Sequence, residues 1–109
     1  MMAKNRVSQE MVDELKNLIL TVVRAIVDHP EDVVVNMRPG EMRLLAELHT
    51  NPRDVGPVVG RRGHVASSIR SIISAFAGKN RVNVDFDYVT EEDNSGRSRD
   101  RGEDRRRTG

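Results

Sequence analysis

A chain of 109 residues suffices for one compact domain, and its composition excludes several classes of function. Cysteine is absent, which excludes disulfide bonds, thiolate zinc sites and cysteine nucleophiles. Aromatic residues make up only 3% of the chain, so a platform of rings for stacking nucleic-acid bases is difficult to build. No apolar run approaches the roughly 18–20 residues of a membrane span, and the N-terminal segment lacks the apolar stretch of a secretory signal. We therefore expect a cytoplasmic protein that does not contact a membrane.

The net charge of +1 conceals an uneven distribution along the chain. Residues 51–81 carry six basic side chains and one acidic side chain, whereas residues 1–50 are net negative. Concentrated positive charge of this kind attracts a polyanion. The middle segment is therefore where we expect a nucleic acid to bind.

The last twenty residues, 90–109, contain no apolar side chain. Such a segment cannot bury enough surface to offset the entropy of ordering it, so we expect a disordered tail after a domain at residues 1–89. The tail carries three consecutive arginines, 105–107, near its end. Two interpretations stay open, a loose arm that seeks nucleic acid and a solubilising terminus.

The first predicted element is an amphipathic helix from Ser8 to Asp28. Apolar residues recur here at spacings of one, three and four, the pattern of a helix with one buried face. The Ser8 hydroxyl is placed to accept a hydrogen bond from an unpaired amide of the first turn. Pro30 is expected to end the helix, because the residue before a proline is pushed out of the helical region.

Two strands joined by a hairpin are predicted next. The segment 33–37 is short and rich in β-branched residues. In the segment 42–48, apolar and polar side chains alternate well enough for a half-buried strand. Pro39 and Gly40 supply turn chemistry between them. An antiparallel pair is the simplest arrangement.

A short helix over residues 51–59, a tight connection at 60–63 and a longer helix over residues 64–77 follow. Asn51 is placed to cap the short helix, and Pro52 occupies its first position, where a missing N–H costs nothing. Gly78 fits the C-cap of the longer helix. One face of the longer helix is apolar and carries Val65, Ile69, Ile72, Ile73 and Phe76.

The last predicted strand covers residues 81–88, with apolar side chains on one face and asparagine and aspartate on the other. The two preceding helices are long enough to form the crossover that a parallel strand requires. The order helix, strand, strand, helix, helix, strand therefore predicts an α+β domain. Its three-stranded mixed sheet carries the helices on one face.

Two glycines bracket two arginines in the connection between the helices, in the order Gly60, Arg61, Arg62, Gly63. Glycine permits positive φ and lets a ligand approach the main chain without a Cβ in the way. The helix that begins at His64 directs unpaired amides and the positive end of its dipole to the same place. The two guanidinium groups add charge and bidentate donors, so the connection is suited to a phosphodiester. An ordinary basic turn would contain the same four residues, and this alternative stays open for the motif taken alone.

In this context the sequence resembles the KH domain in its type II arrangement, and more narrowly the small bacterial single-KH proteins of the KhpA type. The stretches that carry the resemblance are IVDHPEDVVVN, DVGPVVGRRGHVASSIRSII and RVNVDFDY, and the similarity covers nearly all of residues 8–89. The resemblance implies a type II KH fold, α-β-β-α-α-β, that binds single-stranded RNA. In KH domains the GXXG loop clamps the backbone of about four nucleotides while the bases lie in a groove.

The resemblance also implies which residues of this chain bind RNA. The phosphates would be held by Gly60, Arg61, Arg62 and Gly63, with His64 beside them. The apolar groove floor would be formed or supported by Val55, Val58, Val59, Val65 and Ile69. Its far wall would come from Leu45 or Leu48. A groove of this kind relies on aliphatic contacts, which suits a chain with few aromatic residues.

The remaining polar residues give weaker signals. Some of them have both a functional and a structural interpretation, and the others have only a structural one. Arg53 and Arg70 either widen the positive footprint of the loop or lie on solvated helix faces. The three histidines have no spacing that suits a metal, and no acidic cluster accompanies them, so neither a metal nor a cofactor is expected. His29 is expected to make a local cap contact. No P-loop, dinucleotide fingerprint or serine–histidine–acid arrangement is present, and we expect no enzymatic activity.

Two functional classes remain. The first is a non-catalytic protein that binds single-stranded RNA, for which the resemblance implies an RNA chaperone, post-transcriptional or ribosome-assembly role linked to bacterial cell elongation and division. The second is a protein-interaction subunit, because the resemblance also implies homodimers and pairing with a Jag/EloR-type KH protein. Salt separates them, since phosphate contacts weaken steeply with added salt and an apolar contact between subunits does not.

Overall fold

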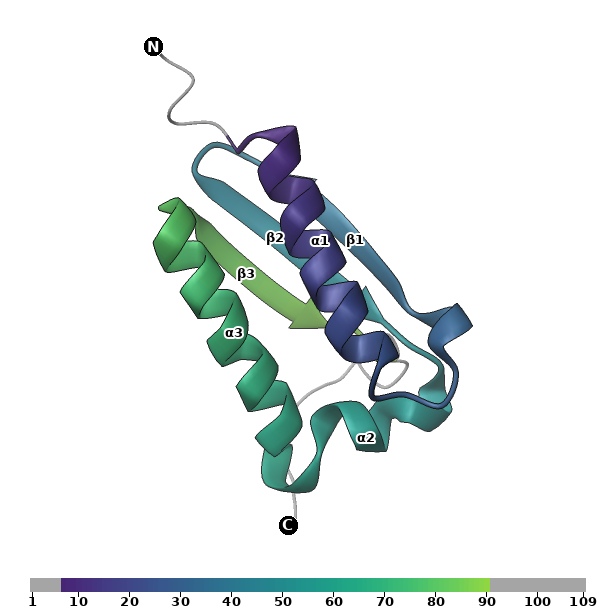
Figure 1. Ribbon diagram of the computed structural model, residues 1–109. Helices are drawn as coiled ribbons and strands as arrows, with labels where there is room; N and C mark the ends of the chain where they lie inside the picture. The colour runs from purple at the N-terminus through teal and green to yellow at the C-terminus, as the bar shows by residue number, and fades with distance from the viewer. Residues whose placement is uncertain (1–6, 91–109) are drawn as a thin grey trace.

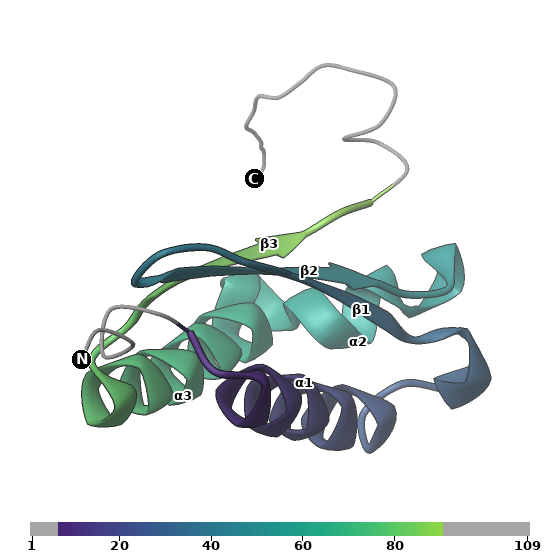
Figure 2. The same cartoon turned by 90° about the horizontal axis from the view of Figure 1, so that it is seen from above.

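The computed structural model describes residues 7–90, in which helices pack against one side of a three-stranded sheet (Figure 1). The elements follow the predicted order: α1 (Gln9–Arg24), β1 (Val34–Pro39), β2 (Arg43–His49), α2 (Val55–Val59), α3 (His64–Asn80) and β3 (Asn83–Tyr88). Figure 2 shows that all three helices lie on the same side of the sheet. The predicted α+β fold is confirmed. None of the helices within residues 7–90 is long and apolar enough to cross a membrane.

The sheet has the order β1-β2-β3. β1 pairs with β2 in antiparallel fashion, as the hairpin prediction required, and β2 pairs with β3 in parallel. The parallel pair exists because α2 and α3 form the crossover between the two strands. Side chains alternate along β2, so Leu44, Ala46 and Leu48 face the helices and are fully buried.

The core lies between the sheet and the helices. α1 contributes a stripe spaced by three and four residues, Val12, Leu15, Ile19 and Val23. The other two helices and the strands add the rest of the buried apolar cluster. Its further members are Val27, Val33, Val35, Leu44, Ala46, Leu48, Val58, Ile69, Ile73 and Val82.

The predicted end of the first helix is wrong. The helix begins where expected, with the Ser8 hydroxyl as its cap, but it ends at Arg24 and does not reach Asp28. Pro30 does not end the helix and instead opens a short 3₁₀ turn. The backbone before this turn is bound by the side chain of Asp54, a tertiary contact described below.

The predicted C-cap of the second long helix is also wrong. α3 runs through Gly78 to Asn80, and the residue in the left-handed conformation is Arg81, with φ of 56°. The amide of Val82 then donates to the Ala77 carbonyl at 3.1 Å. This longer helix delivers Val82 into the core, where it is buried.

The apolar face of α3 is narrower than the sequence indicates. Ile69 and Ile73, one turn apart, are buried, but Ile72 between them is 43% exposed. α3 packs against β3, α2 and α1, and these contacts cover only one stripe of the helix.

The structure describes none of residues 91–109. The predicted disordered tail, residues 90–109, therefore lies outside the described residues apart from Thr90.

Candidate nucleic-acid interface

The connection between α2 and α3 has a backbone conformation that requires glycine. Gly60 has φ of 75° and ψ of 175°, a region that residues with a Cβ essentially do not adopt. Gly63 has φ of 73°, and between them Arg62 also has a positive φ, 55°. Three positive φ values within four residues produce a sharp turn between α2 and α3.

Gly60 is also required by packing. A Cβ built at this position would lie 2.8 Å from the amide nitrogen of Val65 and would collide with the Val65 side chain. A Cβ at Gly63, by contrast, would meet nothing within 4 Å. The first glycine therefore serves the close approach of the two helices, and the second leaves open space beside the main chain.

Hydrogen bonds within the turn fix its shape. The Gly63 amide donates to the Gly60 carbonyl at 3.2 Å, and the His64 amide donates to the Arg61 carbonyl. Gly63 is the N-cap of α3 and supplies no side chain to cap it. The positive end of a 17-residue helix therefore adjoins the turn without a protein carboxylate or hydroxyl as its cap.

Arg61 and Arg62 are both exposed. The ion pairs within residues 7–90 lie elsewhere, between Arg38 and Glu47, between Arg43 and Asp85, and between His29 and Asp54. The two guanidinium groups of the turn thus retain their donors for an external anion.

Asp54 is the one acidic residue of the basic segment, and its side chain is fully buried. Its carboxylate accepts hydrogen bonds from the backbone amides of Asp28 at 3.1 Å and His29 at 3.0 Å, and from Nδ1 of His29 at 3.1 Å. The expected local cap contact of His29 is therefore wrong, because its partner lies 25 residues away. Burial of Asp54 removes the only negative charge of the segment from the surface that carries the arginines.

Opposing effects act on the pKa of Asp54. Burial by itself would raise this pKa, but the backbone amide of Asp28 and the side chain and amide of His29 stabilise the charged form, and the pKa lies below its ordinary value of 3.8. The carboxylate is therefore ionised at neutral pH. It ties the segment after α1 to the residue that precedes α2, and so fixes where α2 begins.

The five apolar residues expected to line the groove divide into two groups. Val58 and Ile69 are almost fully buried and belong to the core. Val55, Val59 and Val65 are half-buried and retain surface for contact with a ligand.

Neither residue named for the far wall is suited to that role. Leu48 is fully buried beneath the helices. Leu45 alternates with it and therefore lies on the opposite face of the sheet, away from α2 and α3. β3, which forms one edge of the sheet, is the strand that adjoins α3.

Arg70 connects α3 to that edge strand. Its Nη1 donates to the backbone carbonyl of Phe86 at 2.9 Å, and the guanidinium carbon lies 5.2 Å from the centroid of the Phe86 ring, within cation–π range. Arg53, the other flanking arginine, is exposed in the 3₁₀ turn before α2. The structure thus places one positive charge against Phe86 of β3 and one beside the start of α2.

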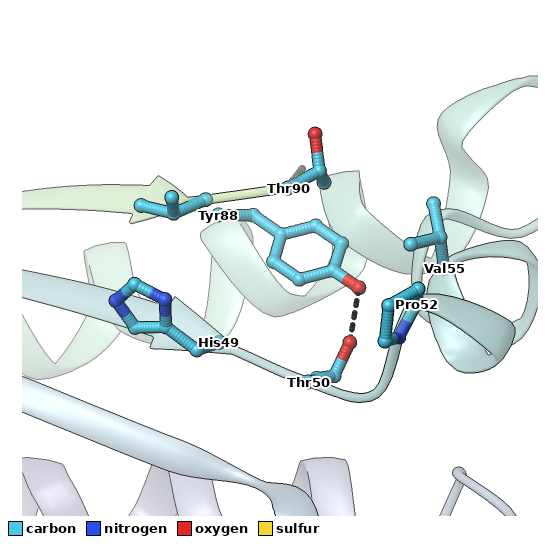
Figure 3. Close-up of a pocket in the computed structure, with 7 residues that line it drawn as sticks. His49, Thr50, Pro52, Val55, Tyr88 and Thr90 are labelled. Atoms are coloured by element: carbon cyan, nitrogen blue, oxygen red, sulfur yellow. Dashed lines mark hydrogen bonds between the residues drawn. The ribbon is translucent and has the colours of Figure 1, made fainter. Parts of the chain in front are cut away.

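A second polar contact joins the ends of β2 and β3. The hydroxyl groups of Thr50 and Tyr88 lie 2.6 Å apart. Figure 3 marks this hydrogen bond with a dashed line. Burial raises the pKa of Tyr88 above its ordinary value of 10.0, although the Thr50 hydrogen bond acts in the opposite direction. The sequence analysis missed this pair and the role of Asp54. The only signals were a lone acid among basic residues and a lone tyrosine at a strand end.

Within the part of the chain that the structure describes, no group of three or more histidine, aspartate or glutamate side chains could hold a metal ion. The histidines are distributed between the segment after α1, the end of β2 and the start of α3.

Comparison with known proteins agrees with the geometry. Residues 16–87 match the family model described as KhpA/KhpB, KH domain. The chain belongs to the KhpA/KhpB family of KH domains. The resemblance seen in the sequence is thereby confirmed, and the matched region spans every element from the middle of α1 almost to the end of β3.

The similar curated proteins are named RNA-binding protein KhpA. The one from Clostridium perfringens (strain 13 / Type A) is 39% identical over 75 residues, which cover 69% of this chain and all of that protein. The one from Listeria monocytogenes serovar 1/2a is 33% identical over 75 residues, 69% of this chain and 99% of its own. The one from Leifsonia xyli subsp. xyli is 42% identical over 64 residues, which cover 59% of this chain and 84% of that protein. No solved structure matches the chain.

These names describe binding proteins and not enzymes, which agrees with the expectation that this KhpA/KhpB-family chain has no catalytic activity.

Proposed function

We propose that this protein binds single-stranded RNA through the turn Gly60–Gly63, without catalysis. The observation that carries the proposal is the turn itself: Arg61 and Arg62 are exposed, form no ion pair within residues 7–90 and adjoin the N-terminus of α3, while the one acid of residues 51–81, Asp54, is buried. A phosphodiester at this position would meet positive charge and main chain with no carboxylate opposing it. The similar proteins named RNA-binding protein KhpA support the same conclusion.

The proposal includes the cellular role that the family resemblance implies. This is an RNA chaperone, post-transcriptional or ribosome-assembly role, linked to cell elongation and division. A single domain offers few phosphate contacts and so binds weakly, and dimerisation or pairing with a Jag/EloR-type KH protein would raise affinity through effective concentration.

The test reverses the charge of the turn. Arg61→Asp/Arg62→Asp should abolish binding of a fluorescein-labelled single-stranded RNA in an anisotropy titration, because both phosphate contacts become repulsive. For the wild-type protein, affinity should fall as salt is added, by about 0.7 in log K per log salt for each phosphate contacted.

The matched control is Lys79→Asp/Arg81→Asp. It changes the net charge by the same amount, but both residues lie at the other end of α3, roughly 22 Å or more from the turn at 1.5 Å per residue. Binding by the control should fall only slightly. Equal affinities of the Arg61/Arg62 variant and the wild type, with native circular dichroism for both, would refute the proposal.

One observation favours the second candidate, a protein-interaction subunit. Ile72 on α3 and Ile26 in the turn after α1 are large apolar side chains that are 43% and 36% exposed. Exposed apolar surface often marks a protein contact. Self-association that persists at high salt, in a protein that binds no RNA, would assign the chain to this class.

A further inference from the structure

A small pocket lies where β2 and β3 end, beside the start of α2 (Figure 3). Its volume is about 140 Å³. One aromatic ring, an imidazole, two threonines and three aliphatic side chains surround it. They are His49, Thr50, Pro52, Val55, Tyr88, Val89 and Thr90.

The volume indicates the size of the group that this pocket accepts. Binding sites for larger organic ligands usually measure about 300–1,000 Å³. A cavity of roughly 150 Å³ accommodates one benzene molecule. The pocket therefore matches a single six-membered ring, which is the ring system of a pyrimidine, and is small for the two fused rings of a purine.

The hydroxyl groups determine which polar atoms suit the pocket. The hydroxyl groups of Thr50 and Tyr88 lie 2.6 Å apart, and either of them can be the donor in this contact. In both arrangements the Tyr88 oxygen retains at least one lone pair that accepts a further hydrogen bond. Uracil N3–H and the cytosine amino group are donors of this kind, and the ring of Tyr88 offers a face for stacking.

The pocket lies close to the phosphate-binding turn. Val55, the first residue of α2, lines the pocket, and Gly60 directly follows the last residue of α2. A helix of five residues is about 7.5 Å long at 1.5 Å per residue. An RNA strand held by its phosphates at Arg61 and Arg62 therefore brings a neighbouring base within reach of Tyr88.

We propose that this pocket receives one pyrimidine base of the bound RNA, stacked on Tyr88 and hydrogen-bonded to its hydroxyl. The inference rests on the proposed function and deepens it by assigning a base preference. It also departs from a groove built of aliphatic side chains alone, since one base would contact an aromatic ring.

The chain itself provides a probe of this pocket. Tyr88 is the only tyrosine, so the ring signals of tyrosine-labelled protein in an NMR spectrum belong to this residue alone. Addition of an oligouridine octamer should shift these signals upfield through stacking, and an oligoadenosine octamer should shift them less.

Variants of Tyr88 test the same contact through the affinity of the protein for each RNA. Tyr88→Leu should weaken oligouridine binding by about 5- to 150-fold, the range that stacking on one ring supports, and should affect oligoadenosine little. Tyr88→Phe is the matched control, because it retains the ring and loses only the hydroxyl. It should retain most of the affinity and lose part of the preference for uridine. If Tyr88→Leu does not fold, the wild-type NMR titration decides the question by itself.

The outcomes separate this inference from the function on which it rests. Oligouridine binding that shifts the amides of residues 60–63 and leaves the Tyr88 ring signals unchanged would overturn the pocket assignment and leave the RNA-binding function intact. Failure of both octamers to bind would refute the proposed function itself. If uridine monophosphate alone bound as tightly as the octamer, the pocket would be a free-nucleotide site, and the inference would be overturned.

Discussion

Replacing Gly60 with alanine tests the geometry of the turn most directly. The substitution adds one methyl group at a residue whose φ is 75° and whose ψ is 175°. Alanine in this region carries about 1–3 kcal/mol of backbone strain. The new Cβ would also lie 2.8 Å from the amide nitrogen of Val65, and this backbone atom has to move to relieve the contact.

The two effects together set the expected magnitude. Overpacking of a tight contact costs about 1–3 kcal/mol, so with backbone strain Gly60→Ala should lower the free energy of unfolding by about 2–6 kcal/mol. For a domain of this size, 1 kcal/mol corresponds to roughly 4–8 °C in Tm. The melting temperature should therefore fall by about 8 °C or more, and RNA affinity should fall because the turn is displaced.

Two alanine variants serve as controls in the same urea and thermal denaturation assays. Gly63→Ala meets no atom within 4 Å, so it should lose only the cost of a left-handed residue, about 1–2 kcal/mol. Gly78→Ala lies inside α3 with open space around it and should stabilise the protein by about 0.5–1 kcal/mol. If Gly60→Ala costs no more than Gly63→Ala, the argument from helix packing is refuted.

Two further predictions concern stability. The lowered pKa of Asp54 means that its hydrogen bonds stabilise the fold above pH 3.8 and that this contribution is lost as the pH falls through the lowered pKa. Asp54→Asn should lower the urea midpoint at pH 7 and reduce the further loss of stability below pH 4. If the variant lost as much stability as the wild type below pH 4, the hydrogen bonds of Asp54 to Asp28 and His29 would not make this contribution. Deletion of residues 91–109, which contain no apolar side chain, should leave Tm nearly unchanged, whereas a large drop would place the domain boundary further along the chain.

Local signals were sufficient for most of the fold. The apolar stripe of α1, the β-branched runs and the Asn51–Pro52 cap each depend on neighbours a few residues away, and each formed as predicted. The glycine-flanked turn was also recognisable, because two of its three positive-φ positions, Gly60 and Gly63, are occupied by glycine, the residue that adopts such φ values without strain. The element order then left few topologies for the sheet.

Contacts distant in sequence were not predictable in this way. His29 and Asp54 are 25 residues apart, and Thr50 and Tyr88 are 38 apart. Leu45 and Leu48 were equivalent candidates for the groove wall until the register of β2 showed which of them faces the helices. Arg70 was an exposed helix residue in the sequence, and only the fold places it over Phe86.

The amino-acid sequence by itself determined the order of helices and strands, the concentration of positive charge in residues 51–81 and the glycine-bracketed turn, because spacing, propensity and backbone sterics act over short distances along the chain. The tertiary structure alone decided where α1 and α3 end, that the single acid of the basic segment is buried, and that a ring-sized pocket forms beside α2. These features depend on which distant segments pack together, since a hydrogen bond or a buried contact forms only when the fold has brought both partners to the same place.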